Sequence, residues 1–273
     1  MLSRIALLAF GLLFAGRAIG DDNLPSPLEN CRQNTAVMRS IGVHDLFDAP
    51  SAVSQMTVNV IDGKLPQVRQ QLKAMSPAEA TRWRQSALIS AAFSGQPAVV
   101  DGLLNDGAAV NGKGWMPGYK AAFFERIVED MKHDPRFGGQ KGVASLKASG
   151  VLENQGQEIG PALVSATQCD DAATVDVLLR HHADAKFRLR PGGADVLMLA
   201  IVHGNAVIVR ALLDRGIDVC ADDRIAQQSR IEYKKKNPEY KTPGATYAEL
   251  GRRQKLPDDL VARLTCPGLD SGR

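Results

Sequence analysis

The chain has 273 residues, of which 44% are hydrophobic and 5% aromatic, and it carries 33 basic and 30 acidic residues. A chain of this length and apolar content can bury a sizeable core. Its nearly balanced charge argues against a nucleic-acid binder, which would carry a concentrated basic face.

Residues 1–20 have the pattern of a secretory signal peptide. A basic start that ends at Arg4 precedes an apolar run over residues 5–15, and small residues follow at positions 18–20. The apolar run is shorter than the roughly 20 residues that a membrane-spanning helix needs, so we expect no stable membrane anchor. We predict export of the chain and cleavage near Gly20.

The mature chain is predicted to begin with a capping segment over residues 21–50, followed by a first, degenerate two-helix unit. In this unit Gly63 precedes Leu72 by nine residues, a step that recurs in the later units. Ser76 then begins the next helix, because Glu79 stands three residues after it in the capping-box pattern.

Residues 86–111 show the two-helix pattern most clearly. Small and apolar residues recur at helical spacing up to Gly95, a polar turn with Pro97 follows, and a second apolar run closes on Gly107, which suits a left-handed helix C-cap. Neither helix is long enough to be stable alone in water, so the unit needs neighbours of the same kind.

A third, divergent unit is predicted further along the chain. Its helices are expected over residues 121–131 and 141–146, with an insert near residues 132–140 in the turn between them. Before this unit, residues 114–119 place large apolar groups on a loop. Trp115 of this loop either packs beneath the next loop or contacts a partner, because exposed aromatic residues on loops are enriched at recognition sites.

A fourth and a fifth unit follow with the same spacing. The fifth unit repeats the nine-residue step from Gly204 to Leu213. The fourth unit has Asp170 and His182 at the positions where the second unit has glycine.

An insert near residues 222–241 follows the fifth unit, and we expect it to form a long loop that carries the lysine run 234–236. The two-helix pattern resumes at Thr246 and closes as a C-terminal cap. The repeats therefore span residues 51–265, and a short tail covers residues 266–273.

The units resemble the ankyrin repeat, which has a period of about 33 residues and a consensus that begins T-P-L-H-x-A. The consensus leucine is matched by Leu88, Leu163 and Leu197, the alanine by Ala91, Ala166 and Ala200, and a pair of leucines by residues 103–104, 178–179 and 212–213. The threonine and histidine of the consensus are not matched, so we expect the fold without consensus-grade stability. The resemblance implies an all-α ankyrin-repeat solenoid of about five to six helix-turn-helix units with extended finger loops.

The chain has four cysteines, Cys31, Cys169, Cys220 and Cys266, and none of them forms a C-x-x-C pair. In an exported chain, an even set of cysteines indicates disulfides rather than metal or redox chemistry. We expect a bridge between Cys220 and Cys266, because stacking would bring the end of the fifth unit next to the end of the last helix. Cys31 and Cys169 would then form a second bridge, although four cysteines allow three connectivities.

The sequence shows no catalytic pattern, because it lacks the G-x-S-x-G, H-E-x-x-H and P-loop motifs and a G-x-G-x-x-G after a strand. The pair His181-His182 ends a helix, where capping explains it better than metal binding, since neighbouring residues point to different faces. His203 is expected to be solvated. We therefore predict a protein that is not an enzyme and that needs no metal and no cofactor.

The ankyrin resemblance implies a surface of first helices and finger loops that holds another protein. The candidate contact residues are aromatic, apolar or basic, and they are Trp115, Met116, Tyr119, Lys186, Arg188, Arg190, Tyr233, Lys234, Lys235, Lys236 and Tyr240. A basic band flanked by aromatic residues indicates an acidic protein surface as the target.

The layout of a signal peptide followed by an ankyrin array is similar to that of the periplasmic ankyrin-type immunity proteins that bacteria pair with type VI secretion effectors, notably phospholipase toxins. This resemblance implies a periplasmic protein that is a monomer alone and forms a heterodimer with a toxin whose active site it occludes. One alternative is a periplasmic scaffold or protective factor, for example one linked to peroxide defence. Another is an enzyme with a non-standard site.

Overall fold

A computed structural model describes four long stretches of the chain and several short ones. The described residues are 31–32, 35–36, 38–39, 47–118, 120, 125, 128–129, 132–133, 140, 143–144, 156–188, 195–236 and 245–268. The chain divides into two compact units, unit 1 over residues 1–162 and unit 2 over residues 163–273.

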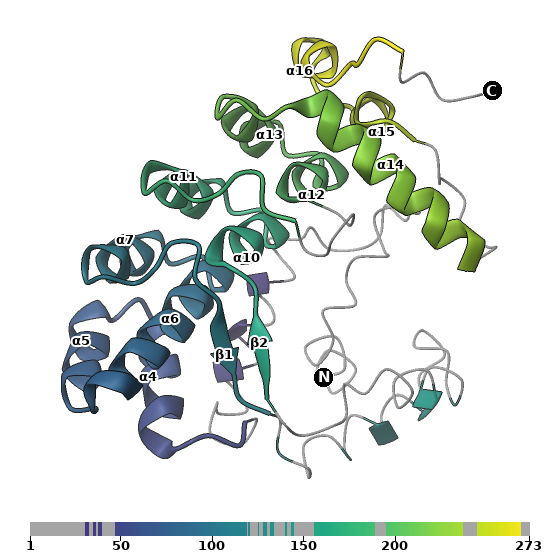
Figure 1. Cartoon of the computed structure of the whole chain (residues 1–273). Helices are drawn as coiled ribbons and strands as arrows, with labels where there is room; N and C mark the ends of the chain where they lie inside the picture. The colour runs from purple at the N-terminus through teal and green to yellow at the C-terminus, as the bar shows by residue number, and fades with distance from the viewer. Residues whose placement is uncertain are drawn as a thin grey trace. The chain divides into compact units, whose positions relative to one another are not determined.

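The described residues of unit 1 include two helix pairs and a small antiparallel sheet (Figure 1). Its elements are α4 (Ser51–Ile61), α5 (Leu65–Lys73), α6 (Pro77–Phe93), α7 (Pro97–Asn105), β1 (Gly114–Met116) and β2 (Gln157–Ile159). The first pair, α4 and α5, packs against α6, and α6 contacts both its own partner α7 and strand β1. Helix α6 is therefore the element around which unit 1 is built.

From residue 162 onward, the described part of the chain forms three helix pairs and one longer helix. Its elements are α10 (Ala162–Gln168), α11 (Ala172–Arg180), α12 (Val196–His203), α13 (Ala206–Leu213), α14 (Val219–Lys236), α15 (Tyr247–Arg253) and α16 (Asp258–Arg263). The first helices of the pairs, α10, α12 and α15, lie in one row, and the second helices, α11, α13 and α16, lie in another (Figure 1). Contacts between α12 and α15, and from α13 to α11 and α16, join successive pairs into two layers.

The described residues thus contain five helix pairs, in agreement with the predicted two-helix units. The predicted third unit lies mostly outside the described residues. Its described positions, which are Glu125, Val128, Glu129, Lys132, His133, Gln140, Val143 and Ala144, are helical. The helix at Lys132, His133 and Gln140 means that the predicted insert near 132–140 begins and ends in helix rather than in a loop.

The leucines that recur at matching positions of the repeats lie in the hydrophobic core. Leu88, Leu163 and Leu197, which match the consensus leucine, are each at most 1% exposed. Leu103, Leu178 and Leu212, the first residues of the paired leucines, are completely buried. The register predicted from the sequence is therefore the register in which the helices pack.

Left-handed backbone closes the helices where the repeat pattern places a glycine. Gly95, Gly107 and Gly204 have positive φ angles. Asp170 and His182, which stand at the glycine positions of the fourth unit, also have positive φ angles, of 57° and 63°. A residue with a Cβ atom is strained in this conformation, so the fold holds two side chains where glycine would be more stable.

Replacing His182 by glycine is therefore expected to raise the free energy of unfolding by about 0.5–1 kcal/mol, because relief of the left-handed strain exceeds the entropy that glycine adds to the unfolded chain. Urea denaturation followed by circular dichroism measures the change. Gly216→Ala is the matched control: φ is +70° and a Cβ atom there meets nothing within 4 Å, so a loss of about 1 kcal/mol would come from the backbone alone. A His182→Gly variant that is less stable than the wild type would contradict the prediction that the backbone at His182 is strained.

Polar side chains begin the helices as the sequence indicates. The predicted capping box is present at α6: the Glu79 N–H donates to Ser76 Oγ, and the Ser76 N–H donates to the Glu79 carboxylate. Thr246 and Glu249 form a second capping box at α15. Local sequence therefore fixes where these helices start.

The insert after the fifth unit is a helix rather than the long loop that we expected. Residues 219–236 form α14, so the prediction is wrong over most of the insert near 222–241. The segment has no glycine or proline and is rich in good helix formers. Asp218 accepts a hydrogen bond from the Ala221 N–H, and acidic residues near the start and lysines at the end favour the helix dipole. Local propensity thus decides the conformation of the insert.

A disulfide ties the start of α14 to the residues after α16. Cys220 and Cys266 are bonded, with their Cα atoms 5.4 Å apart. This pairing is the one expected from the sequence. Cys31 and Cys169 are disulfide-bonded as well, and no cysteine of the described residues has a free thiol.

Candidate protein-binding surface

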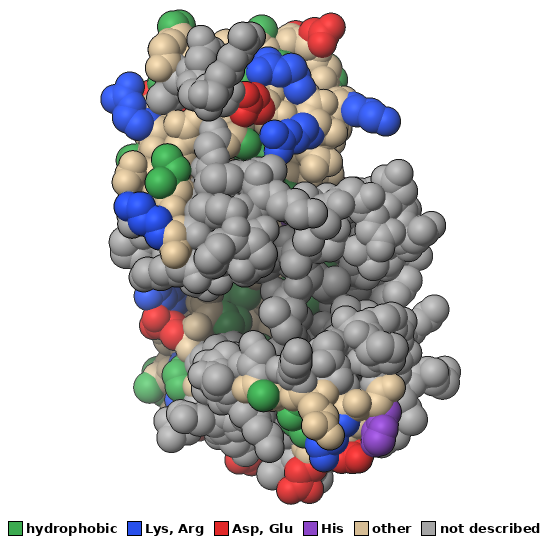
Figure 2. Space-filling model, turned by 90° about the vertical axis from the view of Figure 1, so that its right-hand side faces the viewer, with side chains coloured by type: hydrophobic (Ala, Val, Ile, Leu, Met, Phe, Trp, Pro, Cys, Tyr) green, Lys and Arg blue, Asp and Glu red, His purple; other side chains and the backbone are tan. Residues whose placement is uncertain are grey.

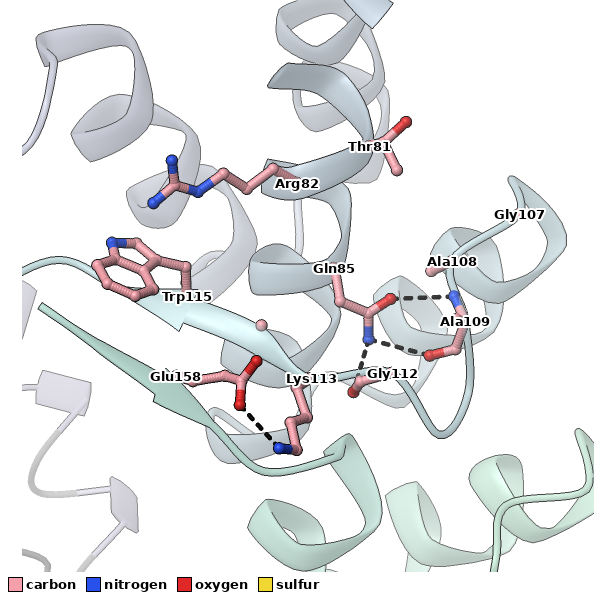
Figure 3. Close-up of a pocket in the computed structure, with 11 residues that line it drawn as sticks. Thr81, Arg82, Gln85, Gly107, Ala108, Ala109, Gly112, Lys113, Trp115 and Glu158 are labelled. Carbon is pink, nitrogen blue, oxygen red and sulfur yellow. Dashed lines mark hydrogen bonds and ion pairs between the residues drawn. The ribbon is translucent and has the colours of Figure 1, made fainter. Parts of the chain in front are cut away.

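A hollow of about 390 Å³ lies in unit 1 between α6 and the loop that leads into β1 (Figure 3). Arg82 and Gln85 of α6, Lys113 and Trp115 at β1, and Glu158 of β2 lie along it. The loop and strand correspond to the finger of the predicted second repeat. The hollow thus joins a first helix to a finger within one repeat.

Gln85 holds the loop in place through both ends of its side-chain amide. Its Oε1 accepts from the Ala109 N–H at 3.0 Å, and its Nε2 donates to the Ala109 and Gly112 carbonyl oxygens at 2.9 and 3.0 Å (Figure 3). One side chain thus satisfies three backbone groups that a loop would otherwise leave to water. The floor of the hollow is therefore set by α6.

Strand β1 lies directly against α6 because glycine permits the approach. A Cβ atom at Gly114 would lie 2.8 Å from Ile89 Cδ1 and 3.1 Å from Ser86 Cα. Ser86 Oγ accepts a hydrogen bond of 3.0 Å from the Trp115 N–H. These contacts fix the backbone from which the Trp115 side chain projects.

Trp115 is half-buried and carries a cation on its ring face. The Arg82 guanidinium carbon lies 4.9 Å from the Trp115 ring centroid and 5.3 Å from that of the buried Trp83. Such cation–π contacts favour the pairing of Arg with aromatic rings. Trp115 therefore packs against its own unit and also borders the hollow.

The small sheet is formed by two strands that are far apart in the sequence. Strand β1 pairs antiparallel with β2, with Gly114 opposite Ile159 and Met116 opposite Gln157. Lys113 Nζ lies 2.7 Å from Glu158 Oε2, but both side chains are more than half exposed, so this ion pair adds little stability. The sheet therefore joins residues that lie on either side of the segment 117–156 in the sequence.

In unit 2, a model of the ankyrin repeat family matches residues 192–224, the segment that holds α12, α13 and the start of α14. The chain contains an ankyrin repeat. With the helix pairs and left-handed turns described above, the fold is an all-α ankyrin-repeat fold. No curated protein matches the chain. Ankyrin repeats are protein-interaction modules, so the match indicates a protein-binding role.

The described part of the chain offers no site for a metal ion. No group of three or more His, Cys, Asp or Glu side chains lies together there in a way that could bind one. His181 caps the C-terminus of α11, and His182 follows it in the left-handed turn. None of the described helices has the length and apolar character to span a bilayer.

Some of the predicted contact residues are described and others are not. Tyr119, Arg190 and Tyr240 lie outside the described residues, as do the side chains of Tyr233, Lys234 and Lys236. In unit 1, Met116 is half-buried beside Trp115 on β1; in unit 2, Lys186 and Lys235 are exposed. These residues remain predicted contacts.

Arg188 has partners inside unit 2. Its guanidinium pairs with the Asp222 carboxylate of α14, and its Nη1 lies 3.6 Å from Oδ2 of Asp195. The Asp195 side chain is only 2% exposed, and it also accepts hydrogen bonds from the Met198 N–H and the Tyr247 hydroxyl. Burial raises the pKa of Asp195 above its ordinary value, against the opposing effect of the Tyr247 hydrogen bond. Arg188 is thus a counter-charge to a buried carboxylate.

Two features of unit 2 differ from what the sequence suggested. His203 is half-buried rather than solvated, because its Nδ1 donates to the carbonyl oxygen of Thr167 at 3.1 Å. The Asp195 cluster was not predicted. Its one local signal is an aspartate directly before the apolar run of α12, which is the N-cap position that Asp195 occupies.

Proposed function

We propose that this protein is exported to the periplasm and acts there as an immunity protein, binding a secreted toxin and occluding its active site. The observation that carries the proposal is an ankyrin repeat in a chain whose described cysteines are all disulfide-bonded. Disulfides of this kind persist in oxidising compartments, and ankyrin repeats serve protein binding. The signal-peptide pattern of residues 1–20 supports the same compartment.

Occlusion requires a fixed surface with a few strong anchors and no catalytic group. Arg82 and Trp115 are residue types enriched among such anchors, and they lie together beside the hollow (Figure 3). The hydrogen bonds of Gln85 and the close packing at Gly114 hold this surface in one conformation before binding. A surface that is already ordered loses less entropy on association.

Co-expression with the product of the neighbouring open reading frame tests the role. A tight equimolar complex that abolishes the toxicity of that product is the expected result, by analogy with type VI effectors such as phospholipases. If the product is not toxic, or if the purified chain neither binds nor neutralises it, the immunity role is wrong. A neighbouring catalase bound by the chain would favour a protective factor instead.

Trp115→Ala is expected to weaken the complex by about 2 kcal/mol, since truncation of a central aromatic anchor typically costs this much. Lys73→Ala, at an exposed position at the end of α5, is the matched control and is expected to leave the affinity unchanged. Isothermal titration calorimetry measures both, and circular dichroism verifies that both variants are folded. Equal affinity of the Trp115 variant and the wild type would place the contact elsewhere without affecting the role.

A further inference from the structure

Arg82 is the cation of the unit 1 hollow whose charge no carboxylate of the described residues neutralises. Three charged side chains line the hollow, and two of them, Lys113 and Glu158, pair with each other at 2.7 Å. Arg82 is exposed, and its guanidinium makes cation–π contacts with Trp83 and Trp115 but no ion pair with a described residue. The lining of the hollow therefore carries one net positive charge, which comes from Arg82 (Figure 3).

Two other arginines of unit 1 do have carboxylate partners. Arg39 lies 2.9 Å from Asp62, and Arg69 lies 2.6 Å from Asp106. Figure 2 shows Lys and Arg side chains mixed with Asp and Glu side chains over the described part of one face. Arg82 differs from Arg39 and Arg69 because aromatic rings, rather than a carboxylate, hold its guanidinium.

The Trp115 ring that Arg82 contacts is held in place by its own neighbours. The Trp115 N–H donates to Ser86 Oγ at 3.0 Å. A Cβ atom at Gly156 would lie 2.8 Å from Cζ2 of the Trp115 ring, so this ring packs closely against the backbone there. A guanidinium that contacts a ring through its face keeps the N–H donors in its plane available to a ligand. Arg82 is therefore positioned before a ligand binds.

The other polar groups of the hollow favour a carboxylate over a phosphate as the ligand. A phosphate group carries a charge of about −1.5 to −2 at neutral pH and is typically bound by several cations or by free backbone N–H groups. In this loop the Ala109 N–H already donates to Gln85 Oε1, and the Gly112 N–H donates to the Ala109 carbonyl oxygen. One guanidinium with two parallel N–H donors matches one carboxylate. The hollow thus fits a singly charged carboxylate.

Small residues leave room for such a ligand beside Arg82. The lining residues of the loop include glycines and alanines, at positions 107–109 and 112. The volume of about 390 Å³ lies in the lower part of the range of about 300–1,000 Å³ that is typical of ligand sites. The hollow can therefore admit a carboxylate side chain together with part of the segment that carries it.

We propose that the hollow binds an aspartate or glutamate side chain of the partner protein, with Arg82 as its counter-ion. Arg82 donates hydrogen bonds to the carboxylate oxygens, and the half-buried Trp115 ring contacts the methylene groups of that side chain. The identity of the partner as a toxin rests on the proposed function, whereas the chemistry of the ligand rests on the hollow. Glu158 is the one acid of the lining, and Lys113 neutralises it, so it opposes the ligand only weakly.

A short peptide tests the hollow without the partner. The probe is acetyl-Gly-Glu-Gly-amide, the control peptide has glutamine in place of glutamate, and both are titrated into the isotope-labelled full chain. The chain has two tryptophans and Arg82 contacts both, so the two indole N–H signals of the NMR spectrum report on this site. The glutamate peptide is expected to shift these signals and to bind at least about threefold more tightly than the control, as for an ion pair at a partly exposed site.

Substitutions of the lining charges are expected to have opposite effects. Arg82→Gln should weaken binding of the glutamate peptide to the level of the control peptide. Glu158→Gln should strengthen it about twofold, because this change removes the acid and leaves Lys113 to attract the ligand. Arg252→Gln, at an exposed arginine of α15 in unit 2, is the matched control and should bind as the wild type does. Circular dichroism verifies that each variant is folded.

Four results of the peptide titrations would each overturn the carboxylate site. The glutamate peptide could fail to bind the wild type, the two peptides could bind equally, Arg82→Gln could bind as the wild type does, or inorganic phosphate could bind more tightly than the glutamate peptide. Peptide binding through Arg82, in a chain that does not neutralise the neighbouring gene product, would leave the site standing and remove the immunity role.

The complex with the neighbouring gene product gives a second test. A double-mutant cycle combines Arg82→Gln with substitution of each aspartate and glutamate of that product in turn, and calorimetry measures the affinities. Coupling between Arg82 and one carboxylate of the product is expected, because paired charges are not independent of each other. Full neutralisation of the product without any such coupling would overturn the site and leave the immunity role standing.

Discussion

Replacing Cys220 and Cys266 together by alanine is expected to lower the free energy of unfolding by about 4 kcal/mol, the loop-closure entropy of a cross-link of this span. The two cysteines are 46 residues apart in sequence, and the loop that they close contains most of α14 and all of α15 and α16. Without the bond, the unfolded chain regains the freedom of that whole loop. Urea denaturation of the wild type and the double variant, followed by circular dichroism, measures the difference.

The effect should be strongest in the last helices of the chain. Hydrogen exchange of amides in α14 and α16 is expected to accelerate in the double variant, while amides of α6 in unit 1 should exchange as before. Cys220→Ala alone is expected to lose as much stability as the double variant, because either change breaks the same bond. A loss below about 1 kcal/mol would mean that contacts such as Arg263 with Asp214 already close the loop without the disulfide.

Local features of this fold could be predicted from the sequence, because the residues that cause them are adjacent in the chain. Ser76 and Glu79 form their capping box within one turn of helix. The nine-residue step located Asp170 and His182 at turns whose backbone is left-handed. The buried leucines followed from periodicity alone, since each repeat places its own leucine in the core.

The conformation of the insert was missed although its cause is also local. The insert near residues 222–241 was expected to be a loop because the repeat register has a loop at that place. Helix propensity and the cap at Asp218 decide otherwise. An insert is not bound by the register of the repeats, so its own composition was the better guide.

The candidate surface was only partly predictable, since it depends on residues that are distant in sequence. Trp115 was found as an aromatic residue on a loop, but its contact with Arg82 and the support from Gln85 join the loop to a helix about 30 residues earlier. Arg188 was predicted as a partner contact from its charge alone. Its pairing with Asp195 and Asp222 depends on packing that no local pattern encodes.

Replacing Arg188 by methionine is expected to destabilise the protein by about 3 kcal/mol at neutral pH, because it leaves the buried Asp195 carboxylate without its counter-charge. Methionine keeps much of the side-chain volume, so the loss reports the charge rather than a cavity. Asp222, on α14, is also left without this partner, but it is more exposed than Asp195. The double variant Arg188→Met/Asp195→Asn is expected to recover most of the loss, since the asparagine Oδ1 can still accept from the Met198 N–H and its Nδ2 can donate to the Tyr247 hydroxyl oxygen.

The loss of stability caused by Arg188→Met is expected to depend on pH. Burial raises the pKa of Asp195 above its ordinary value of 3.8, so the folded state holds the proton at pH values where the unfolded state has lost it. Protonation of Asp195 therefore adds stability as the pH falls from neutral towards 3.8, by at most about 1.4 kcal/mol per pH unit, and the contribution is complete below 3.8. The loss caused by Arg188→Met should accordingly shrink on acidification, because a neutral Asp195 needs no counter-charge. Urea denaturation of the wild type, Arg188→Met and the double variant across this range measures it, and a loss in Arg188→Met that is the same at every pH would show that Arg188 stabilises unit 2 by packing and not by charge.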